Sequence, residues 1–298
     1  MKKFIIYIIL FTCLILVSIY LILLKADGYS DPYYLKFTTP RQNSLILGTS
    51  KAAQGIIPDV ANKILGNDIY NYSFNMNISP FGPKYLESIK RKLSQKSHSG
   101  IFIVTVDCWS ISCMGENPND TTKFKENNSF IGQIKIVDQK PNLHYLLKYM
   151  FGNYYRIIFK SSDAVLHENG WFEVSINTDS VSVNRRTKST LQEYKNFLSN
   201  YKYSQARFDY LVKTIEFLNK FGSVYLVRLP VSKGLMDIEH QCMPNFDYKI
   251  KQIADKTCGY LDLTPKNETF SYTDGVHLDK RSGKIVTEEI AQWIKNEK

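Results

Sequence analysis

The chain has 298 residues, of which 44% are hydrophobic and 22% charged, a composition typical of a globular protein and not of a disordered one. Its 38 Lys and Arg residues against 28 Asp and Glu residues give a formal net charge of +10, but the basic residues are scattered along the sequence. Because there is no concentrated basic stripe and no nucleic-acid-binding motif, we expect no nucleic-acid partner; an anionic membrane surface or envelope polymer fits the charge better.

The N-terminal segment is the first predicted element, a membrane-spanning helix. Residues 4–24 form an apolar run without a charged residue, and at about 1.5 Å per residue this run spans roughly 30 Å, the thickness of a bilayer's hydrocarbon core. Lys2 and Lys3 precede it, so the positive-inside rule predicts a cytoplasmic N-terminus and an extracytoplasmic remainder. A cleaved signal peptide is the alternative, but this run is longer than the usual signal-peptide core, and residues 24–26 make a poor cleavage site. We therefore predict a single-pass anchor in the cell membrane over residues 1–25.

The rest of the chain is predicted to form one domain. Residues 26–43 are a polar, tyrosine-containing connector that leads away from the membrane, and residues 44–298 alternate short apolar runs with amphipathic stretches. This alternation predicts a three-layer α/β/α sandwich around a mostly parallel, five-stranded sheet. The expected strands are residues 44–48, 69–73, 101–106, 224–227 and 259–263. Three helices are expected: one that begins at Pro83, one over residues 208–218 with Gly222 as its C-cap, and one over residues 286–294.

Residues 109–200 interrupt this alternation. They contain a polar stretch (116–128), an aromatic helical segment (145–159) and a passage rich in Ser and Asn (171–186). We interpret them as a large insertion that covers the functional site and shapes a substrate groove.

Five cysteines are present, and Cys13 lies in the predicted membrane helix. Cys108, Cys113, Cys242 and Cys258 allow three disulfide connectivities, and unpaired buried thiols are an equally good interpretation. No His lies at ligand spacing near these cysteines, and the sequence has no metal-ligand cluster and no Gly-rich phosphate loop. We therefore expect no metal and no cofactor.

The first motif that carries chemistry is Gly48–Thr49–Ser50, directly after the first expected strand. A nucleophilic serine must be exposed at a strand-to-helix turn, near backbone N–H groups that can receive an oxyanion, and Gly48 permits such a tight turn. An α/β-hydrolase would require Gly-x-Ser-x-Gly, but Ala52 occupies the place of the second Gly. The tripeptide alone is a weak signal.

The second motif is Thr273–Asp274–Gly275–Val276–His277, just before the last expected helix. A serine becomes a good nucleophile only when a base accepts its proton, and His277 is the candidate base. Asp274 can fix the tautomer of His277 and stabilise its imidazolium. Taken alone, the motif is also compatible with an ordinary helix N-terminus, with Asp274 as a cap and His277 exposed.

Together the two motifs resemble the SGNH (GDSL-like) hydrolase superfamily, in which a Gly-Asp-Ser-like block follows the first strand and an Asp-x-x-His block precedes the last helix. The resemblance covers residues 44–108 and 208–296, and it implies an SGNH-hydrolase, flavodoxin-like fold with Ser50 as nucleophile, His277 as base and Asp274 as orienting acid. The anchor and the phrases Ile-Leu-Gly-Thr-Ser and Asp-Gly-Val-His-Leu are most similar to the envelope branch. That branch includes the membrane-anchored D-alanine transfer protein and polysaccharide O-acyltransferases and esterases.

The remaining blocks of that family differ here. Met76 stands where the family has an oxyanion-binding glycine; its backbone N–H remains, and Asn75 or Asn77 can donate a side-chain amide. The expected oxyanion and substrate-binding residues are therefore Ser50, Asn75, Met76 and Asn77. Asp107 follows the strand at residues 101–106 where the family has an asparagine, and a carboxylate there would repel an oxyanion.

The resulting expectation is a membrane-anchored, extracytoplasmic serine esterase or O-acyltransferase that acts on acyl esters of cell-envelope glycans through an acyl-serine intermediate. Its expected partners are an acylated envelope polysaccharide or lipid-linked glycan, the membrane through residues 4–24, and, by resemblance, a multi-pass membrane acyltransferase. The alternative is a non-catalytic SGNH-fold envelope protein that binds polysaccharide or such an acyltransferase, and the altered oxyanion blocks motivate it.

Overall fold

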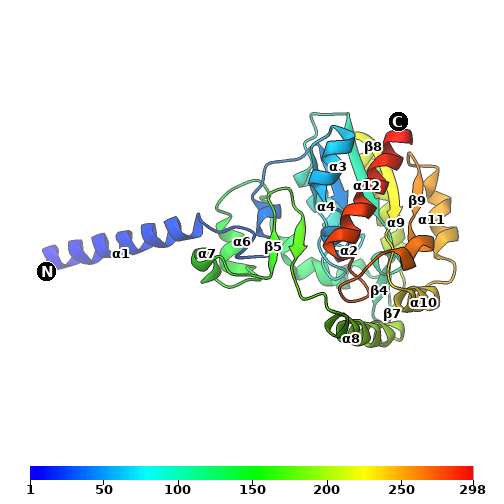
Figure 1. The fold of residues 1–298 in the computed structure, drawn as a ribbon. Coiled ribbons are helices and arrows are strands. Elements are labelled where there is room, and N and C mark those ends of the chain that lie inside the picture. The colour runs from blue at the N-terminus through cyan, green and yellow to red at the C-terminus, as the bar shows by residue number, and fades with distance from the viewer. Residues whose placement is uncertain (298) are drawn as a thin grey trace.

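The computed structural model describes residues 1–297 and contains a central five-stranded sheet with helices on both faces (Figure 1). The strand order is β2-β1-β3-β8-β9, and all four pairings are parallel. The fold class predicted from the sequence is therefore confirmed. The central strands are β1 (Ser44–Leu47), β2 (Ile69–Asn71), β3 (Gly100–Thr105), β8 (Gly222–Arg228) and β9 (Tyr260–Asp262).

Twelve α-helices and five short 3-10 helices surround this sheet in the part of the chain that the structure describes. The α-helices are α1 (Lys2–Leu23), α2 (Ser50–Gly55), α3 (Pro58–Leu65), α4 (Pro83–Lys92), α5 (Phe130–Gln133), α6 (Leu143–Lys148), α7 (Arg156–Phe159), α8 (Ser180–Leu198), α9 (Gln205–Leu218), α10 (Lys233–Cys242), α11 (Phe246–Ala254) and α12 (Lys280–Glu297). The 3-10 helices are η1 (Tyr34–Phe37), η2 (Trp109–Ile111), η3 (Thr121–Lys123), η4 (Lys125–Asn128) and η5 (Thr264–Thr269).

The two faces of the sheet carry alternate side chains of the same strands, because successive residues of a strand point in opposite directions. Leu45, Phe102 and Leu226 point to one face, where they pack with α4, α9 and α11 in one hydrophobic cluster. Ile46 and Ile103 point to the other face, where they pack with α2, α3 and α12 in a second cluster. Strands buried on both faces explain why their sequences are continuously apolar.

Residues 109–200 lie outside the central sheet. They form η2 to η4, α5 to α8 and the antiparallel hairpin of β5 (Ala164–Leu166) and β6 (Phe172–Val174). Their strand β4 (Ser112–Met114) pairs with β7 (Tyr201–Tyr203), which follows the segment.

The segment expected to be a connector, residues 26–43, packs into the domain. The η1 residues Tyr34 and Phe37 are fully buried despite the polar composition around them. Lys36 is also buried, and its Nζ donates to the carbonyl oxygens of Asn71 (2.8 Å), Ser73 (2.6 Å) and Gly170 (3.0 Å). Burial, with a smaller contribution from nearby Lys92, lowers the pKa of Lys36 well below its usual value. The segment thereby connects the end of β2 to the β5–β6 hairpin.

One predicted helix end was wrong. Helix α9 ends at Leu218 with Asn219 as its C-cap, whereas Gly222 begins β8. Gly222 lies opposite Gly100 in the parallel pair of β3 and β8, and a Cβ atom on Gly222 would come within 2.0 Å of the Gly100 carbonyl oxygen. The glycine is therefore explained by this close approach of two strands and not by a helix terminus.

Helix α1 extends away from the globular domain, and its residues 2–22 are exposed (Figure 1). It is the one helix within residues 1–297 that is long and apolar enough to cross a membrane. A signal sequence would have the same length and composition.

Candidate active site

Ser50 is the first residue of α2 and follows a tight turn at the end of β1. Gly48 in this turn has φ of 152°, and a Cβ atom there would lie 1.8 Å from Thr105 Oγ1. The Gly48 carbonyl oxygen accepts a hydrogen bond from Ser79 Oγ (2.7 Å), and the Gly48 N–H donates to Tyr85 OH (3.1 Å). These contacts fix the turn and leave Ser50 partly exposed at the carboxyl edge of the sheet.

His277 and Asp274 lie in the loop that precedes α12. Asp274 Oδ1 accepts the backbone N–H groups of Val276 and His277, both at 2.9 Å, and its Oδ2 lies 2.7 Å from His277 Nδ1. His277 Nε2 lies 2.9 Å from Ser50 Oγ, although the two residues are 227 positions apart in sequence. The predicted triad residues are therefore brought together in one hydrogen-bonded series. In that series Nδ1 donates to the carboxylate, and Nε2 is free to accept the serine proton.

The carboxyl group of Asp274 is held in its ionised form. Burial by itself would raise its pKa. The hydrogen bond and charge interaction with His277, together with the two backbone N–H groups, outweigh burial and lower the pKa from 3.8 to about 2. An ionised carboxylate at this place favours the tautomer with a proton on Nδ1 and stabilises an imidazolium.

Helix α8 from the inserted segment contacts the loop that holds these two residues. Arg186 Nε donates to the Thr273 carbonyl oxygen (2.9 Å), directly before Asp274. Gly275 has φ of 86°, and a Cβ atom there would meet Thr187 of α8 at 3.0 Å. The Gly275 carbonyl oxygen accepts the Ser232 N–H at 2.9 Å. The loop is thus fixed from the insertion on one side and from the β8–α10 turn on the other.

Lys51, the residue after Ser50, lies in a buried charge network that the sequence did not reveal. Its Nζ lies 3.1 Å from Asp107 Oδ2 and 2.6 Å from Glu239 Oε1. Glu239 Oε1 also accepts Trp109 Nε1–H (3.1 Å), and its Oε2 lies 3.6 Å from Arg228 Nη2. Burial lowers the pKa of Lys51, but the two carboxylates outweigh burial and raise it, so the ammonium stays charged. Asp107 is therefore neutralised by a buried cation, which removes the reason to expect that it repels an oxyanion.

The three expected oxyanion residues after β2 lie beside the Ser50 turn, since Phe74 N–H donates to the Gly48 carbonyl oxygen (3.3 Å). Asn75 Nδ2 donates to Tyr33 OH (2.9 Å), and Asn75 Oδ1 accepts the Asn77 N–H (2.9 Å). These bonds occupy the Asn75 side chain and the Asn77 backbone. Across the described chain, no acceptor is found for the Met76 N–H. The Asn77 side-chain amide likewise has no acceptor among the described residues, so this amide and the Met76 N–H both remain available to a ligand.

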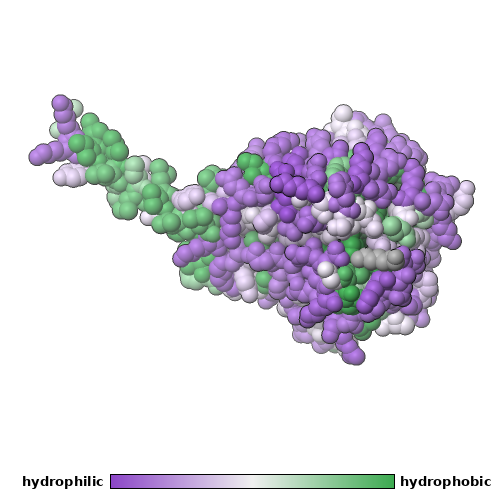
Figure 2. Space-filling model, turned by 90° about the horizontal axis from the view of Figure 1, so that it is seen from above, coloured by the Kyte–Doolittle hydropathy of each residue, from purple (hydrophilic) through white to green (hydrophobic). Residues whose placement is uncertain are grey.

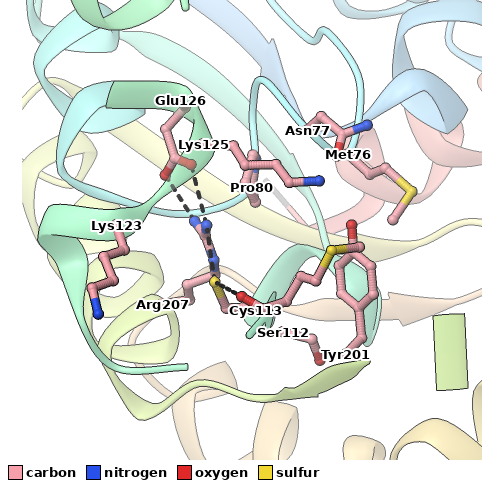
Figure 3. A pocket seen from close by; sticks show the side chains of 11 residues that line it. Met76, Asn77, Pro80, Ser112, Cys113, Lys123, Lys125, Glu126, Tyr201 and Arg207 are labelled. Carbon is pink, nitrogen blue, oxygen red and sulfur yellow. Dashed lines mark hydrogen bonds and ion pairs between the residues drawn. The ribbon is translucent and has the colours of Figure 1, made fainter. Parts of the chain in front are cut away.

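A small cavity lies beyond Met76 and Asn77, toward the buried pair of Arg207 and Glu126 (Figure 3). Arg207 Nη1 lies 2.8 Å from Glu126 Oε1, with both side chains almost fully buried. The cavity has a volume of about 30 Å³, the size of a water molecule. The cavity is too small to hold an acylated sugar. Its ion pair is buried and joins α9 to η4, so we regard it as part of the structure and not as a ligand site.

The cysteines are unpaired: all five are free, and the Cys108 thiol interacts with that of Cys242. Burial raises the pKa of Cys108 well above its usual value. Over residues 1–297 no group of three or more His, Cys, Asp or Glu side chains is arranged to hold a metal ion.

Comparisons with known proteins leave the family open. No protein-family model matches the chain, and no curated protein matches it. Among solved structures, the chain is similar to the crystal structure of a carbohydrate acetylesterase family member from Sinorhizobium meliloti. The two share 10% sequence identity with a TM-score of 0.39, over 85% of this chain and 98% of that one. A likeness at this level supports neither a family nor an activity for this chain.

Proposed function

We propose that the protein is a membrane-anchored serine esterase or O-acyltransferase that acts on acyl esters of cell-envelope glycans. One observation carries the proposal: Asp274, His277 and Ser50 form a hydrogen-bonded series with distances of 2.7 and 2.9 Å. These are the distances that a general base and its nucleophile require for proton transfer. A binding protein that had merely kept the fold would not need this geometry.

In the proposed reaction, Ser50 Oγ attacks the acyl carbonyl carbon while His277 Nε2 takes the hydroxyl proton. The resulting imidazolium is stabilised by the Asp274 carboxylate. The oxyanion of the tetrahedral intermediate accepts hydrogen bonds from the backbone N–H groups of Ser50 and Met76. When the intermediate collapses, the bond to the leaving alcohol breaks and His277 returns the proton to that alcohol, which leaves an acyl group on Ser50.

The second half of the reaction repeats these steps with a different nucleophile. Water or a sugar hydroxyl gives its proton to His277 and attacks the acyl-serine carbonyl, and Ser50 recovers its proton as the ester breaks. Water as acceptor makes the protein an esterase, and a sugar hydroxyl makes it an acyltransferase.

The Lys51–Asp107 pair has an electrostatic role in this proposal. Asp107 accepts the Ser110 N–H on Oδ1 (2.7 Å) and faces Lys51 with Oδ2, so both of its oxygens have partners. A carboxylate without the ammonium would oppose the negative charge that develops on the substrate. Lys51 therefore acts as a positioning and charge-balancing residue.

The cell-envelope location rests on α1 and on the residues that precede its apolar core. The helix is long enough to cross a bilayer, and Lys2 and Lys3 favour a cytoplasmic N-terminus. This orientation holds the domain on the extracytoplasmic side, close to lipid-linked and surface glycans. The resemblance of the anchor and of the phrases Ile-Leu-Gly-Thr-Ser and Asp-Gly-Val-His-Leu to envelope SGNH proteins favours glycan esters as the substrate class.

The proposal is tested by labelling the full chain in membranes with a fluorophosphonate, which reacts with an activated serine. We expect wild-type protein to be labelled at Ser50, and Ser50→Ala and His277→Ala variants to remain unlabelled. Ser189→Ala, which changes an exposed serine on α8, is the matched control and should label normally. Wild-type protein that is folded but never labelled would favour the non-catalytic alternative. Incubation with an acylated glycan then separates the two activities, because an esterase releases free acid and a transferase moves the acyl group to another hydroxyl.

A further inference from the structure

An unusual apolar surface lies beside the point where α1 joins the globular domain. It consists of six large side chains from α6, α7 and the loop between them: Leu147, Phe151, Tyr154, Tyr155, Ile158 and Phe159. We call this surface the apolar collar. Phe151, Phe159 and Leu147 are 75%, 72% and 70% exposed, and the other three are more than half exposed. Single exposed apolar residues are common on soluble proteins, but a cluster of this kind marks an interaction surface.

The apolar collar is fixed to the chain that leaves α1. The backbone N–H groups of Phe151 and Gly152 donate to Asp31 Oδ2 at 2.6 and 3.0 Å. Lys160 Nζ donates to the Lys25 carbonyl oxygen (3.0 Å) and pairs with Asp27. Figure 1 shows α6 and α7 beside the domain end of α1, and Figure 2 shows hydrophobic residues on both α1 and the adjoining part of the domain. The collar therefore continues the apolar surface of the helix at one end.

The charges around the collar suit a lipid surface. The segment 135–160, which carries it, has five basic residues, Lys135, Lys140, Lys148, Arg156 and Lys160, of which Lys160 pairs with Asp27. Its one acidic residue, Asp138, pairs with Arg41. Tyrosines together with Lys and Arg are typical of residues at the boundary between hydrocarbon and headgroups, where long basic side chains reach the phosphates.

We propose that the apolar collar lies in the headgroup region of the bilayer that α1 crosses, with its aromatic side chains inserted at the level of the first acyl carbons. The proposal rests on the membrane anchor that is part of the proposed function. It adds a second attachment beside the first, so the domain cannot swing freely about the end of α1. The Ser50 site is then held at a constant height and orientation above the membrane, which restricts its substrates to esters that reach that height.

The test adds one tryptophan at a time to the full chain, which already has three, in vesicles that contain anionic phospholipid, and measures the fluorescence that each added residue contributes. Phe151→Trp and Phe159→Trp report on the collar. Tyr248→Trp is the matched control, because Tyr248 is 67% exposed on α11, at the end of the domain away from α1 (Figure 1). With brominated phospholipids we expect the added fluorescence of Trp at 151 and 159 to be quenched several-fold more than that of Trp at 248. Aqueous acrylamide should give the opposite order.

Two controls separate this proposal from the anchor and from the enzymatic activity. Flotation of the vesicles shows whether the chain is inserted, and fluorophosphonate labelling in the same vesicles shows whether Ser50 is active. Suppose that the Phe151→Trp protein floats with the vesicles and Ser50 is labelled, but the added tryptophan is quenched by acrylamide and not by brominated lipid. That result overturns the collar proposal and leaves the anchor and the enzymatic activity standing. Protection of Trp at 151 from both quenchers also overturns it, because the collar is then covered by a second copy of the chain. Protein that does not float overturns both the anchor and the collar.

Discussion

Lys51 Nζ lies 3.1 Å from Asp107 Oδ2, and both side chains are buried next to the candidate nucleophile. The pair joins the first turn of α2 to the end of β3, so it connects the carboxyl ends of neighbouring strands at the level of Ser50. Glu239 from α10 completes the group at 2.6 Å from the same ammonium.

Replacing Lys51 with Met should destabilise the protein and slow the labelling of Ser50. The change leaves Asp107 without its cation, and breaking a buried ion pair from one side costs ~3–5 kcal/mol. Urea unfolding measures the loss of stability, and fluorophosphonate labelling below the unfolding range measures reactivity. The double variant Lys51→Met/Asp107→Asn should recover part of the stability, since it removes the uncompensated carboxylate. A single variant as stable and reactive as the wild type would contradict the assigned role.

Asp274→Asn should reduce the rate of Ser50 labelling with little change in the fold. An amide at this position no longer favours the proton on His277 Nδ1 and does not stabilise the imidazolium, and in a comparable triad this change costs about 10⁴-fold in rate. The chain offers a matched control in Asp237→Asn. Asp237 precedes His240 with the same spacing, but both side chains are exposed on α10. Equal effects of the two substitutions would show that labelling does not depend on the triad.

The stability of the protein should depend on pH through Asp274 at acid pH. The pKa of this carboxyl falls from 3.8 to about 2 on folding, so the unfolded chain binds the proton more tightly. Its contribution to stability is therefore fully present above pH ~4 and is lost as the pH falls through about 2. A shift of this size corresponds to about 2 kcal/mol. The difference in free energy of unfolding between wild type and Asp274→Asn should shrink between pH 5 and 2, and a constant difference would refute the assignment.

Met76 should matter through its backbone and not through its side chain. Met76→Ala keeps the N–H group proposed to bind the oxyanion, so Ser50 should be labelled at nearly the wild-type rate. Met76→Pro removes that donor, and loss of one oxyanion donor slows comparable enzymes about 10²–10³-fold. Thermal unfolding of both variants separates loss of the donor from loss of the fold. If the folded proline variant is labelled as fast as the wild type, the oxyanion is bound elsewhere, and if the folded alanine variant is as slow as the proline variant, the Met76 side chain is needed as well.

The sequence predicted the sheet and the triad because each depends on local signals. The strand at residues 101–106 is a nearly continuous β-branched run, and a parallel sheet brings the ends of such strands to one edge. Ser50 follows the first strand on a glycine turn, and the Asp-x-x-His spacing at residues 274–277 allows a hydrogen bond within the loop. That spacing also occurs at Asp237 and His240, and only the position beside the last helix distinguishes the two.

The charge network could not be predicted, because it depends on which charged residues are buried. Lys51 and Glu239 are 188 positions apart, and lysines and glutamates are most often exposed. The same reason explains the connector: residues 26–43 are polar in composition, yet Tyr34, Lys36 and Phe37 have no exposed surface. Composition averages over a segment, whereas packing depends on single side chains whose partners come from distant parts of the chain.

The 227 positions between Ser50 and His277 also bear on when the proposed activity could begin. If the N-terminus stays in the cytoplasm and the domain crosses the membrane in the order of its sequence, the loop with Asp274 and His277 emerges long after Ser50. Until that loop arrives, the serine has no base and the growing polypeptide cannot attack any ester. If the protein is the enzyme proposed above, it is therefore inactive while the domain is being exported and becomes active only once this loop has reached Ser50.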